Sequence, residues 1–445
     1  MGPRGLVGGR ARSPSSDPVT SPRRSCESQK IFRRSAAFGR ESGMRYAKNI
    51  SLLLAVAISL LMLAACGQKS NCSGITFGSS GSGSSGGGLN GASSVCGAGS
   101  VGNGGGGGSG AASDLLYYLG GGTVIDVAGL NSTTFANVVG YTPIGFANGT
   151  QLGQNFWIVN KKYLYVPTIA PTGGGQILAY AITRASGALT TLGSSPFATS
   201  TTSPDVAVSD PQGRFLFVSD EAAGTIAVFM IDPTTGNLTA SGAPVNTGAG
   251  PNRMVVDGTG TYLYFPTVDF VYGFSIDQKS GALTPLSGSP FNIPMSELQA
   301  DSTGQFLLGV SVSGGTNVYV IPIAASTGTL GTPTTFPTVS APSTLALSPN
   351  GKFLFTFAVD RNNQPLPVEG YTFDVTTGTL TAMANSPFTN LPKVASGLFD
   401  QNGAVMIGVT VTSFTPYFIN ATSGEPTSPV PALGVAHDQR FALTN

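Results

Sequence analysis

The chain has 445 residues, with 62 glycines, 30 prolines and only 10% charged residues. This composition is typical of an all-β protein with many turns and argues against a mainly helical fold. The formal net charge is +1, but residues 1–66 hold eleven of the basic and three of the acidic residues, which leaves a formal charge of −7 in the remainder. Since that remainder lacks the basic surface that nucleic-acid binding needs, DNA and RNA are not expected as partners.

The first 66 residues divide into two parts. Residues 1–43 are rich in Arg, Ser and Pro without apolar periodicity, so we expect a disordered basic extension. Met44 opens a different pattern, in which Arg45 and Lys48 precede an apolar run over residues 50–62. That run has the length of a secretory signal and is short for a membrane span. Met44 is therefore a candidate start codon, in which case residues 1–43 are not translated.

The apolar run ends in Leu63-Ala64-Ala65-Cys66-Gly67. This segment resembles a bacterial lipobox, in which the cysteine is lipidated and becomes the first residue of the mature protein. The resemblance implies that residues 44–66 are a lipoprotein signal peptide and that Cys66 anchors the protein to the bacterial cell envelope, outside the cytoplasm. Gly67 after the cysteine would favour the outer membrane or periplasm in a Gram-negative host. The alternative is a signal peptide or anchor with an incidental cysteine.

Residues 67–113 are rich in Gly and Ser and are expected to form a flexible tether. The glycines lack the Lys-Ser/Thr pair and the strand and helix of a phosphate loop, so a nucleotide site is not expected. Cys72 and Cys96 lie in the tether and either pair in an oxidising compartment or remain free thiols. The sequence shows no metal-ligand spacing of Cys and His, and neither a metal nor a cofactor is expected.

Two half-motifs alternate from Asp114 to Asn445. The first is an Asp/Pro/Asn/Gly turn followed by an aromatic or aliphatic strand, and its five clear strands start at Phe215, Tyr262, Phe306, Phe353 and Val405. The second is an apolar strand, a Thr/Ser-Gly turn, Leu-Thr and often Ser-Pro-Phe. Its clear copies cover residues 177–197, 226–245, 271–291, 318–336, 368–388 and 417–430.

With divergent copies included, each half-motif occurs seven times, and the five clear strands start 44 to 52 positions apart. That spacing fits one four-stranded blade per repeat, so the sequence predicts an all-β, seven-bladed β-propeller over residues 114–445. The array begins with a second half-motif near Thr123 and ends with a first half-motif at Phe441-Ala442-Leu443. We therefore expect the N- and C-terminal strands to pair and close the ring, which removes two sheet edges.

The repeats resemble a known family. The Gly-x-Phe-Leu-Phe-Val strand at residues 213–218, the Thr/Ser-Gly-x-Leu-Thr turn and the recurrent Ser-Pro-Phe are similar to those of the lactonase-type seven-bladed propellers. That group includes 6-phosphogluconolactonase and the carboxymuconate cyclases and overlaps the YVTN-repeat proteins. The resemblance covers about residues 114–445 and implies a site for a lactone or another sugar-like molecule at one mouth of the axial channel.

Polar residues in the loops at that mouth are the candidate site residues. The catalytic candidates are Glu221 and Arg253, because the family has a Glu after a Tyr-Val-x-Asn strand where this chain has Phe217-Val218-Ser219-Asp220-Glu221. A carboxylate beside an Arg could activate water or hold a lactone, while the Arg stabilises the oxyanion. Alternatively, Asp220 and Glu221 are solvated loop acids. The ligand-binding candidates are Asp220, Asn252, Asp269, Glu297, Asp360, Arg361 and Lys393.

The chain departs from the family where the family commonly has Pro-Arg-His. Here Pro251 is followed by Asn252 in place of Arg and Arg253 in place of His, so the imidazole that would shuttle protons is missing. The chain's single histidine, His437, is expected to have a structural or surface role, and no Gly-x-Ser-x-Gly elbow in a strand-to-helix setting supports a triad. Trp157 is expected in the core.

Three functions are compatible with these observations. The first is a lipid-anchored binding module for a small molecule or a protein partner, the second an active lactonase that uses Glu221 and Arg253, and the third a structural scaffold of the envelope. A monomer is expected in each case.

Overall fold

The computed structural model describes residues 114–444 apart from Ser132, Thr133, Gly140, Ser313, Gln401 and Ala436, all within a compact unit that spans residues 103–445. The basic extension, the signal peptide with Cys66 and the tether with Cys72 and Cys96 lie outside the described residues. Within them, no helix has the length and apolarity required to cross a bilayer.

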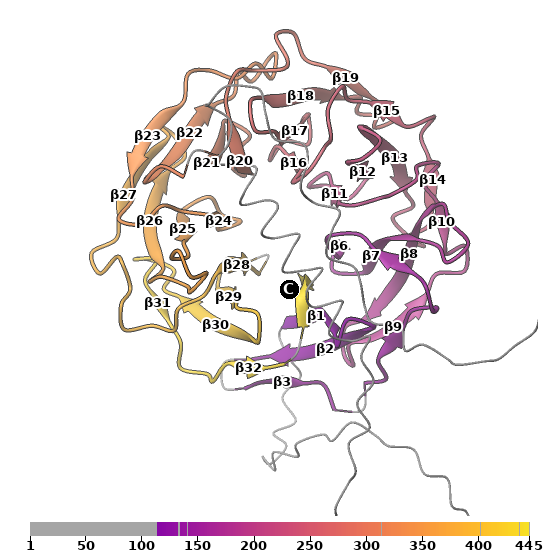
Figure 1. Ribbon diagram of the computed structural model, residues 1–445, viewed down its shortest axis with the longest axis horizontal. Helices are drawn as coiled ribbons and strands as arrows, with labels where there is room; N and C mark the ends of the chain where they lie inside the picture. Colours follow the sequence, from indigo (N-terminus) through magenta and orange to yellow (C-terminus); the bar gives the residue numbers. More distant parts are fainter. Residues whose placement is uncertain are drawn as a thin grey trace, which may run out of the picture. The chain divides into compact units, whose positions relative to one another are not determined.

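Seven antiparallel β-sheets surround a central axis (Figure 1), which confirms the predicted seven-bladed propeller. Each blade has four strand positions from the axis outward, and in blades 1, 2, 3 and 7 one or more positions are filled by two short strands. Blade 1 contains β33 (His437–Leu443), β1 (Asp114–Gly120), β2 (Val124–Leu130), β3 (Phe135–Asn137) and β4 (Ile144–Gly145). Blade 2 contains β5 (Gln151–Leu152), β6 (Trp157–Val159), β7 (Tyr163–Ile169), β8 (Gly175–Thr183), β9 (Ala188–Thr191) and β10 (Phe197–Ala198).

The other five blades follow along the chain. Blade 3 contains β11 (Ala207–Ser209), β12 (Phe215–Asp220), β13 (Thr225–Ile231), β14 (Leu238–Ala240) and β15 (Val245–Asn246). Blade 4 contains β16 (Val255–Val256), β17 (Tyr262–Pro266), β18 (Val271–Ile276) and β19 (Leu283–Pro285). Blade 5 contains β20 (Met295–Ala300), β21 (Phe306–Ser311), β22 (Asn317–Pro322) and β23 (Thr334–Pro337). Blade 6 contains β24 (Thr344–Leu347), β25 (Phe353–Phe357), β26 (Glu369–Asp374) and β27 (Thr379–Ala382). Blade 7 contains β28 (Ser396–Phe399), β29 (Val405–Val409), β30 (Ser413–Ile419), β31 (Pro426–Thr427) and β32 (Leu433–Gly434).

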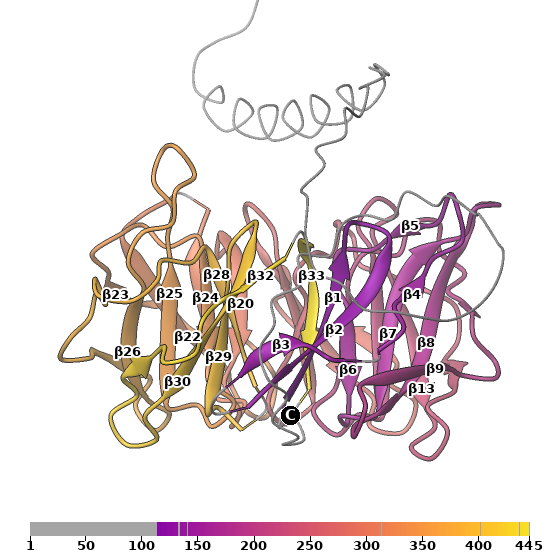
Figure 2. The ribbon, with the colours of Figure 1, turned by 90° about the horizontal axis from the view of Figure 1, so that it is seen from below.

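The ring closes in blade 1, where the C-terminal strand β33 pairs with β1 (Figure 2). In the register, Leu116 lies opposite Leu443 and Tyr118 opposite Phe441, which confirms the predicted pairing of the two ends. The repeat pattern predicted that each end of the chain would supply one half-motif of this blade. Instead, the C-terminal segment supplies one strand position and the N-terminal segment three. The pattern misses β1 because all seven of its residues are buried and no Asp-Gly turn precedes it.

The recurrent Asp-x-x-Gly turns between the first and second strands have a common hydrogen-bond design. In blade 3, Asp210 Oδ1 accepts hydrogen bonds from the backbone N–H groups of Arg214 and Phe215, at 2.7 and 2.8 Å. Asp257 makes the equivalent pair of bonds in blade 4, and Asp301 in blade 5. The turn glycine has a left-handed backbone, with φ of +66° at Gly213, which residues with a Cβ rarely adopt.

Apolar side chains pack between adjacent blades, and the described residues form seven hydrophobic clusters, one at each junction. Three buried tyrosines add a hydrogen bond across a junction to the third-to-fourth strand turn of the next blade. The hydroxyls of Tyr117, Tyr165 and Tyr264 donate to the carbonyl oxygens of Gly187, Gly236 and Gly328, at 2.8, 2.7 and 2.7 Å. These bonds fix the distance between neighbouring blades.

Tyr264→Phe should lower the free energy of unfolding by about 1–3 kcal/mol, because it removes the only side-chain donor to a buried carbonyl of blade 5. Tyr272→Phe is the matched control, since the Tyr272 hydroxyl makes no hydrogen bond within the described part of the chain and should change stability by less than about 0.5 kcal/mol. Urea denaturation of both variants measures the difference, and equal stabilities would contradict the junction role of Tyr264.

Candidate functional site

The candidate residues lie in loops at one end of the ring. Because successive strands of a blade run in opposite directions, the loop after each second strand and the connection into the next blade emerge at the same end. Glu221 follows β12, and Asn252 and Arg253 precede β16. Side-chain contacts among these loops define one site over blades 2 to 5.

Glu221 is held by groups from the blades on both sides. Asn252 Nδ2 donates to Glu221 Oε2 at 3.2 Å, and the backbone N–H of Glu221 donates to Asp205 Oδ2 at 2.9 Å. The Gln154 side chain lies near the Glu221 carboxylate and stabilises its charged form. Burial and then the charge of Asp205 raise the pKa of Glu221, while the bonds from Asn252 and Gln154 oppose that rise.

Asp205 lies in a similar environment. Burial is the main cause that raises its pKa, and the charge of Asp220 acts in the same direction. The hydrogen bond from the backbone of Glu221 has the opposite effect. Two neighbouring carboxyl groups at this mouth therefore take up protons more readily than free side chains do.

Two glycines allow the loops to approach this closely. A Cβ at Gly250 would lie 2.8 Å from the carbonyl oxygen and 2.9 Å from Cγ of Glu221. A Cβ at Gly153, next to Gln154, would collide with the carbonyl oxygen of Asp205. Glycine at both positions thus sets where the Glu221 carboxylate can lie.

Arg253 forms an ion pair with Glu297 of blade 5, and the two side chains are 51% and 12% exposed. Two local distortions bring them together. Arg253 has a left-handed backbone with φ of +48°, and the pairing of β20 with β21 shifts register between Met295 and Glu297, as at a β-bulge. The bulge places Glu297 beside Gln299 and the backbone of Leu345, which both stabilise its charged form.

Burial raises the pKa of Glu297 to about 7. The charge of Arg253 and the hydrogen bonds from Leu345, Gln299 and Arg253 oppose burial without cancelling it. A carboxyl group with this pKa exchanges protons near neutral pH, as a general acid or base must.

We refer to Gln154, Asp205, Glu221, Asn252, Arg253 and Glu297 as the mouth cluster. Asn252 and Arg253 join its two halves, since the first contacts blade 3 and the second contacts blade 5. The structure thus pairs Arg253 with Glu297 and Glu221 with Asn252, and no hydrogen bond or ion pair joins Glu221 to Arg253 within the described residues. Asn252 Oδ1 is buried and has no hydrogen-bond partner in the part of the chain that the structure describes.

Asp220 and Asp360 stabilise loops by hydrogen bonds to backbone groups, Asp220 in its own loop and in the connection that enters blade 3, and Asp360 in its own loop. The Asp220 carboxylate accepts from the backbone N–H groups of Thr202, Ser203 and Ala223 and from the Thr202 hydroxyl. Burial alone would raise the pKa of Asp220, but these hydrogen bonds outweigh it and lower the pKa. Asp360 Oδ1 accepts from the backbone N–H groups of Asn362 and Gln364.

Three other predicted residues lie apart from the mouth cluster. The side chains of Asp269, Arg361 and Lys393 are exposed and, across the part of the chain that the structure describes, make no hydrogen bond or ion pair. His437 begins β33, but its side chain lies outside the described residues. Trp157 is half-buried, and its indole N–H donates to Ser209 Oγ at 3.0 Å. Among the described residues, no group of three or more His, Cys, Asp or Glu side chains is placed to hold a metal ion.

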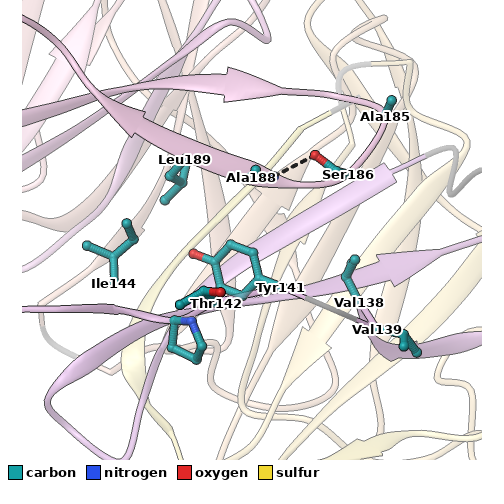
Figure 3. Close-up of a pocket in the computed structure, with 10 residues that line it drawn as sticks. Val138, Val139, Tyr141, Thr142, Ile144, Ala185, Ser186, Ala188 and Leu189 are labelled. Carbon is teal, nitrogen blue, oxygen red and sulfur yellow. Dashed lines mark hydrogen bonds between the residues drawn. The ribbon is translucent and has the colours of Figure 1, made fainter.

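A concave surface apart from the mouth cluster lies between the outer strands of blades 1 and 2 (Figure 3). We call it the outer groove, and it has a volume of about 450 Å³. Its lining includes Val138, Val139, Tyr141, Ile144 and Leu189 and contains no charged side chain.

Comparisons with known proteins support the lactonase-type architecture. The family model "Lactonase, 7-bladed beta-propeller" matches residues 195–296, which confirms the predicted resemblance over blades 3 and 4. A candidate 6-phosphogluconolactonase from Bacteroides fragilis is 18% identical, with a TM-score of 0.57 over 75% of this chain and 98% of that one. The periplasmic gluconolactonase of Pseudomonas aeruginosa is 17% identical, with a TM-score of 0.56 over 74% of this chain and 98% of that one. At these identities the solved structures show a shared fold. A search of the curated proteins found no match.

Glu297→Gln should remove a pH dependence of stability. Because burial raises the pKa of Glu297 from 4.5 to about 7, its contribution to stability is complete below about pH 4.5 and is lost as the pH rises through 7. The variant should therefore gain on the wild type by up to about 3 kcal/mol over that interval. Urea denaturation across this pH range measures the gain. Asp269→Asn changes an exposed carboxylate without partners in the described residues, so its curve of stability against pH should be parallel to that of the wild type. A parallel curve for Glu297→Gln would contradict the raised pKa of Glu297.

Proposed function

We propose that this lactonase-like propeller is a binding module for a small, uncharged, sugar-like molecule such as a sugar lactone, held at the mouth cluster. The observation that carries the proposal is the Glu221 carboxylate, which accepts a hydrogen bond from Asn252 at the rim beside Gln154, while Asn252 Oδ1 has no hydrogen-bond partner among the described residues. Carboxylate and amide oxygens accept hydrogen bonds from hydroxyl groups, and the amide nitrogens donate to ring and carbonyl oxygens.

The charge of the mouth cluster favours an uncharged ligand. Asp205, Glu221 and Glu297 contribute three carboxyl groups against the single guanidinium of Arg253, which is already paired with Glu297. A phosphorylated or carboxylate ligand would be repelled unless further cations joined the site. The name of the Pseudomonas aeruginosa neighbour, a gluconolactonase, supports the lactone class.

The second candidate is hydrolysis of the bound lactone, and the near-neutral pKa of Glu297 beside Arg253 favours it. In this mechanism Glu297 takes a proton from a water molecule as the water oxygen attacks the lactone carbonyl. Arg253 stabilises the oxyanion of the tetrahedral intermediate. The ring C–O bond then breaks, and the proton returns to the leaving oxygen to give a hydroxy acid. In this mechanism the Arg253 guanidinium contacts both Glu297 and the oxyanion. Glu221, which is hydrogen-bonded to Asn252, takes no part in the proton transfer.

Calorimetric titration of the full chain with gluconolactone tests the binding proposal. Glu221→Gln should weaken binding by about 10- to 100-fold, because it removes a charged acceptor of hydroxyl hydrogen bonds. Asp269→Asn, an exposed loop acid outside the cluster, should bind like the wild type. Absence of saturable binding, or equal affinity of Glu221→Gln and the wild type, would sink the proposal.

The same samples decide between binding and turnover. If the protein opens the lactone faster than water does, Glu297→Gln should slow the reaction by at least about 100-fold, as expected for loss of a general base. Glu221→Ala then distinguishes the two carboxylates, since it should weaken binding more than it slows turnover of bound lactone. If the wild-type protein opens the lactone no faster than water does, the lactonase proposal is wrong and the binding-module proposal remains.

We also propose that Cys66 carries the lipid anchor and that residues 67–113 tether the propeller to the envelope. Metabolic labelling with a fatty acid in a bacterial host should label the wild-type chain and not Cys66→Ser. Cys72→Ser is the matched control and should remain labelled, since it lies after the lipobox. Equal labelling of Cys66→Ser and Cys72→Ser would contradict the anchor.

A further inference from the structure

A concave region lies in the axial channel toward the end that carries the turns between the first and second strands of the blades, opposite the loop of Glu221. It has a volume of about 550 Å³ and is bounded by the innermost strands of blades 2 to 7 and the turns that follow several of them. We call it the axial cavity. Its lining includes Trp157, Met254, Val256, Leu347 and Leu398. Of these, only Met254 is fully buried, so apolar side chains face the channel interior in the free protein.

The two carboxylates among the described residues that line the axial cavity already have partners. The Asp210 carboxylate accepts from the backbone of Arg214 and Phe215 and pairs with the Arg214 guanidinium at 2.7 Å. The Asp301 carboxylate accepts from the backbone of its own turn in the same way. No lysine, arginine or histidine is among the described residues that line the cavity. A charged ligand would therefore lose its hydration without gaining a counter-charge.

We propose that the axial cavity binds one small, uncharged, predominantly apolar molecule in contact with Trp157 and Leu398. The volume lies within the range of about 300–1,000 Å³ that is typical of ligand pockets. Apolar residues make up most of the described lining beside Asn160, Ser209, Asp210, Gln299, Asp301, Ser302 and Ser348. Trp157 supplies a large flat surface for contact. The site is distinct from the proposed one, because it shares none of the six residues of the mouth cluster and selects for different chemistry, although Met254 and Gln299 of its lining adjoin Arg253 and Glu297.

Trp157 makes the proposal directly testable, because it is the only tryptophan in the chain. The probe is N-phenyl-naphthylamine, an uncharged fluorescent aromatic amine. Titrated into the full chain, it should bind saturably at one site and quench the emission of Trp157 by energy transfer. Binding without quenching of Trp157, or no saturable binding, would overturn the proposal.

Two matched variants locate the probe. Leu398→Asp places a carboxylate in the axial cavity at a side chain that is 36% exposed, and should weaken binding by at least about tenfold, because the carboxylate cannot be desolvated by an apolar ligand. Val139→Asp makes the same kind of change in the outer groove, at a side chain that is 99% exposed, and should leave binding unchanged.

Loss of binding in Val139→Asp with retention in Leu398→Asp would place the probe in the outer groove and refute the proposal. Circular dichroism checks that both variants fold. If Leu398→Asp does not fold, Leu347→Ser on the neighbouring blade replaces it, with a smaller but measurable loss of affinity expected. Unchanged affinity in Leu347→Ser would then count against the site.

Discussion

The pairing of β33 with β1 is the constraint on which the rest of the structure depends. It joins residues more than three hundred positions apart, and Thr444 extends it by donating its N–H to the carbonyl oxygen of Leu115 at 2.8 Å and accepting from the Leu115 N–H through its hydroxyl at 3.0 Å. Without this contact β1 would become an open sheet edge, and the clusters at both junctions of blade 1 would lose side chains of β33. The mouth cluster draws residues from four blades, so its distances exist only in the closed ring.

Within that ring, carboxyl groups divide into two kinds according to how many backbone donors they receive. Asp210 and Asp220 each accept at least two backbone N–H bonds, which satisfies the charge and fixes a turn or loop. Asp205 and Glu297 are half-buried and Glu221 lies at the exposed rim; all three receive fewer compensating donors, and partial burial raises the pKa of each. A carboxyl group that the fold leaves under-satisfied is free to exchange a proton or to accept a ligand hydroxyl, which is why these three define the candidate site.

The repeat pattern predicted the blades because the chemistry of each turn is local: an Asp four or five residues before the N–H groups it accepts, and a glycine at positive φ. The same pattern placed Asn252, Arg253 and Glu297 at the channel mouth. It could not predict their partners, because the left-handed backbone of Arg253 and the bulge before Glu297 have no sequence signal. Gln154 and Asp205 were missed for a related reason. They lie in irregular connections, and their contacts with Glu221 depend on how three blades converge.

The interactions that stabilise the blades do not involve the side chains of Asn252 and Arg253 at the mouth, so these residues can change with little loss of stability. The hydrogen bonds that hold each blade lie in its turns, and the apolar clusters lie between blades. Asn252 and Arg253 take part in neither, although they lie within the segment that matches the lactonase family. Substitution there alters charge and hydrogen bonding at the mouth while the junction of blades 3 and 4 keeps its packing. Glu297 and Gln299 lie two residues apart on β20 and therefore on the same face of the strand. Glu297 belongs to the mouth cluster and Gln299 lines the axial cavity, so substitutions on this face can also change the channel without changing the blade.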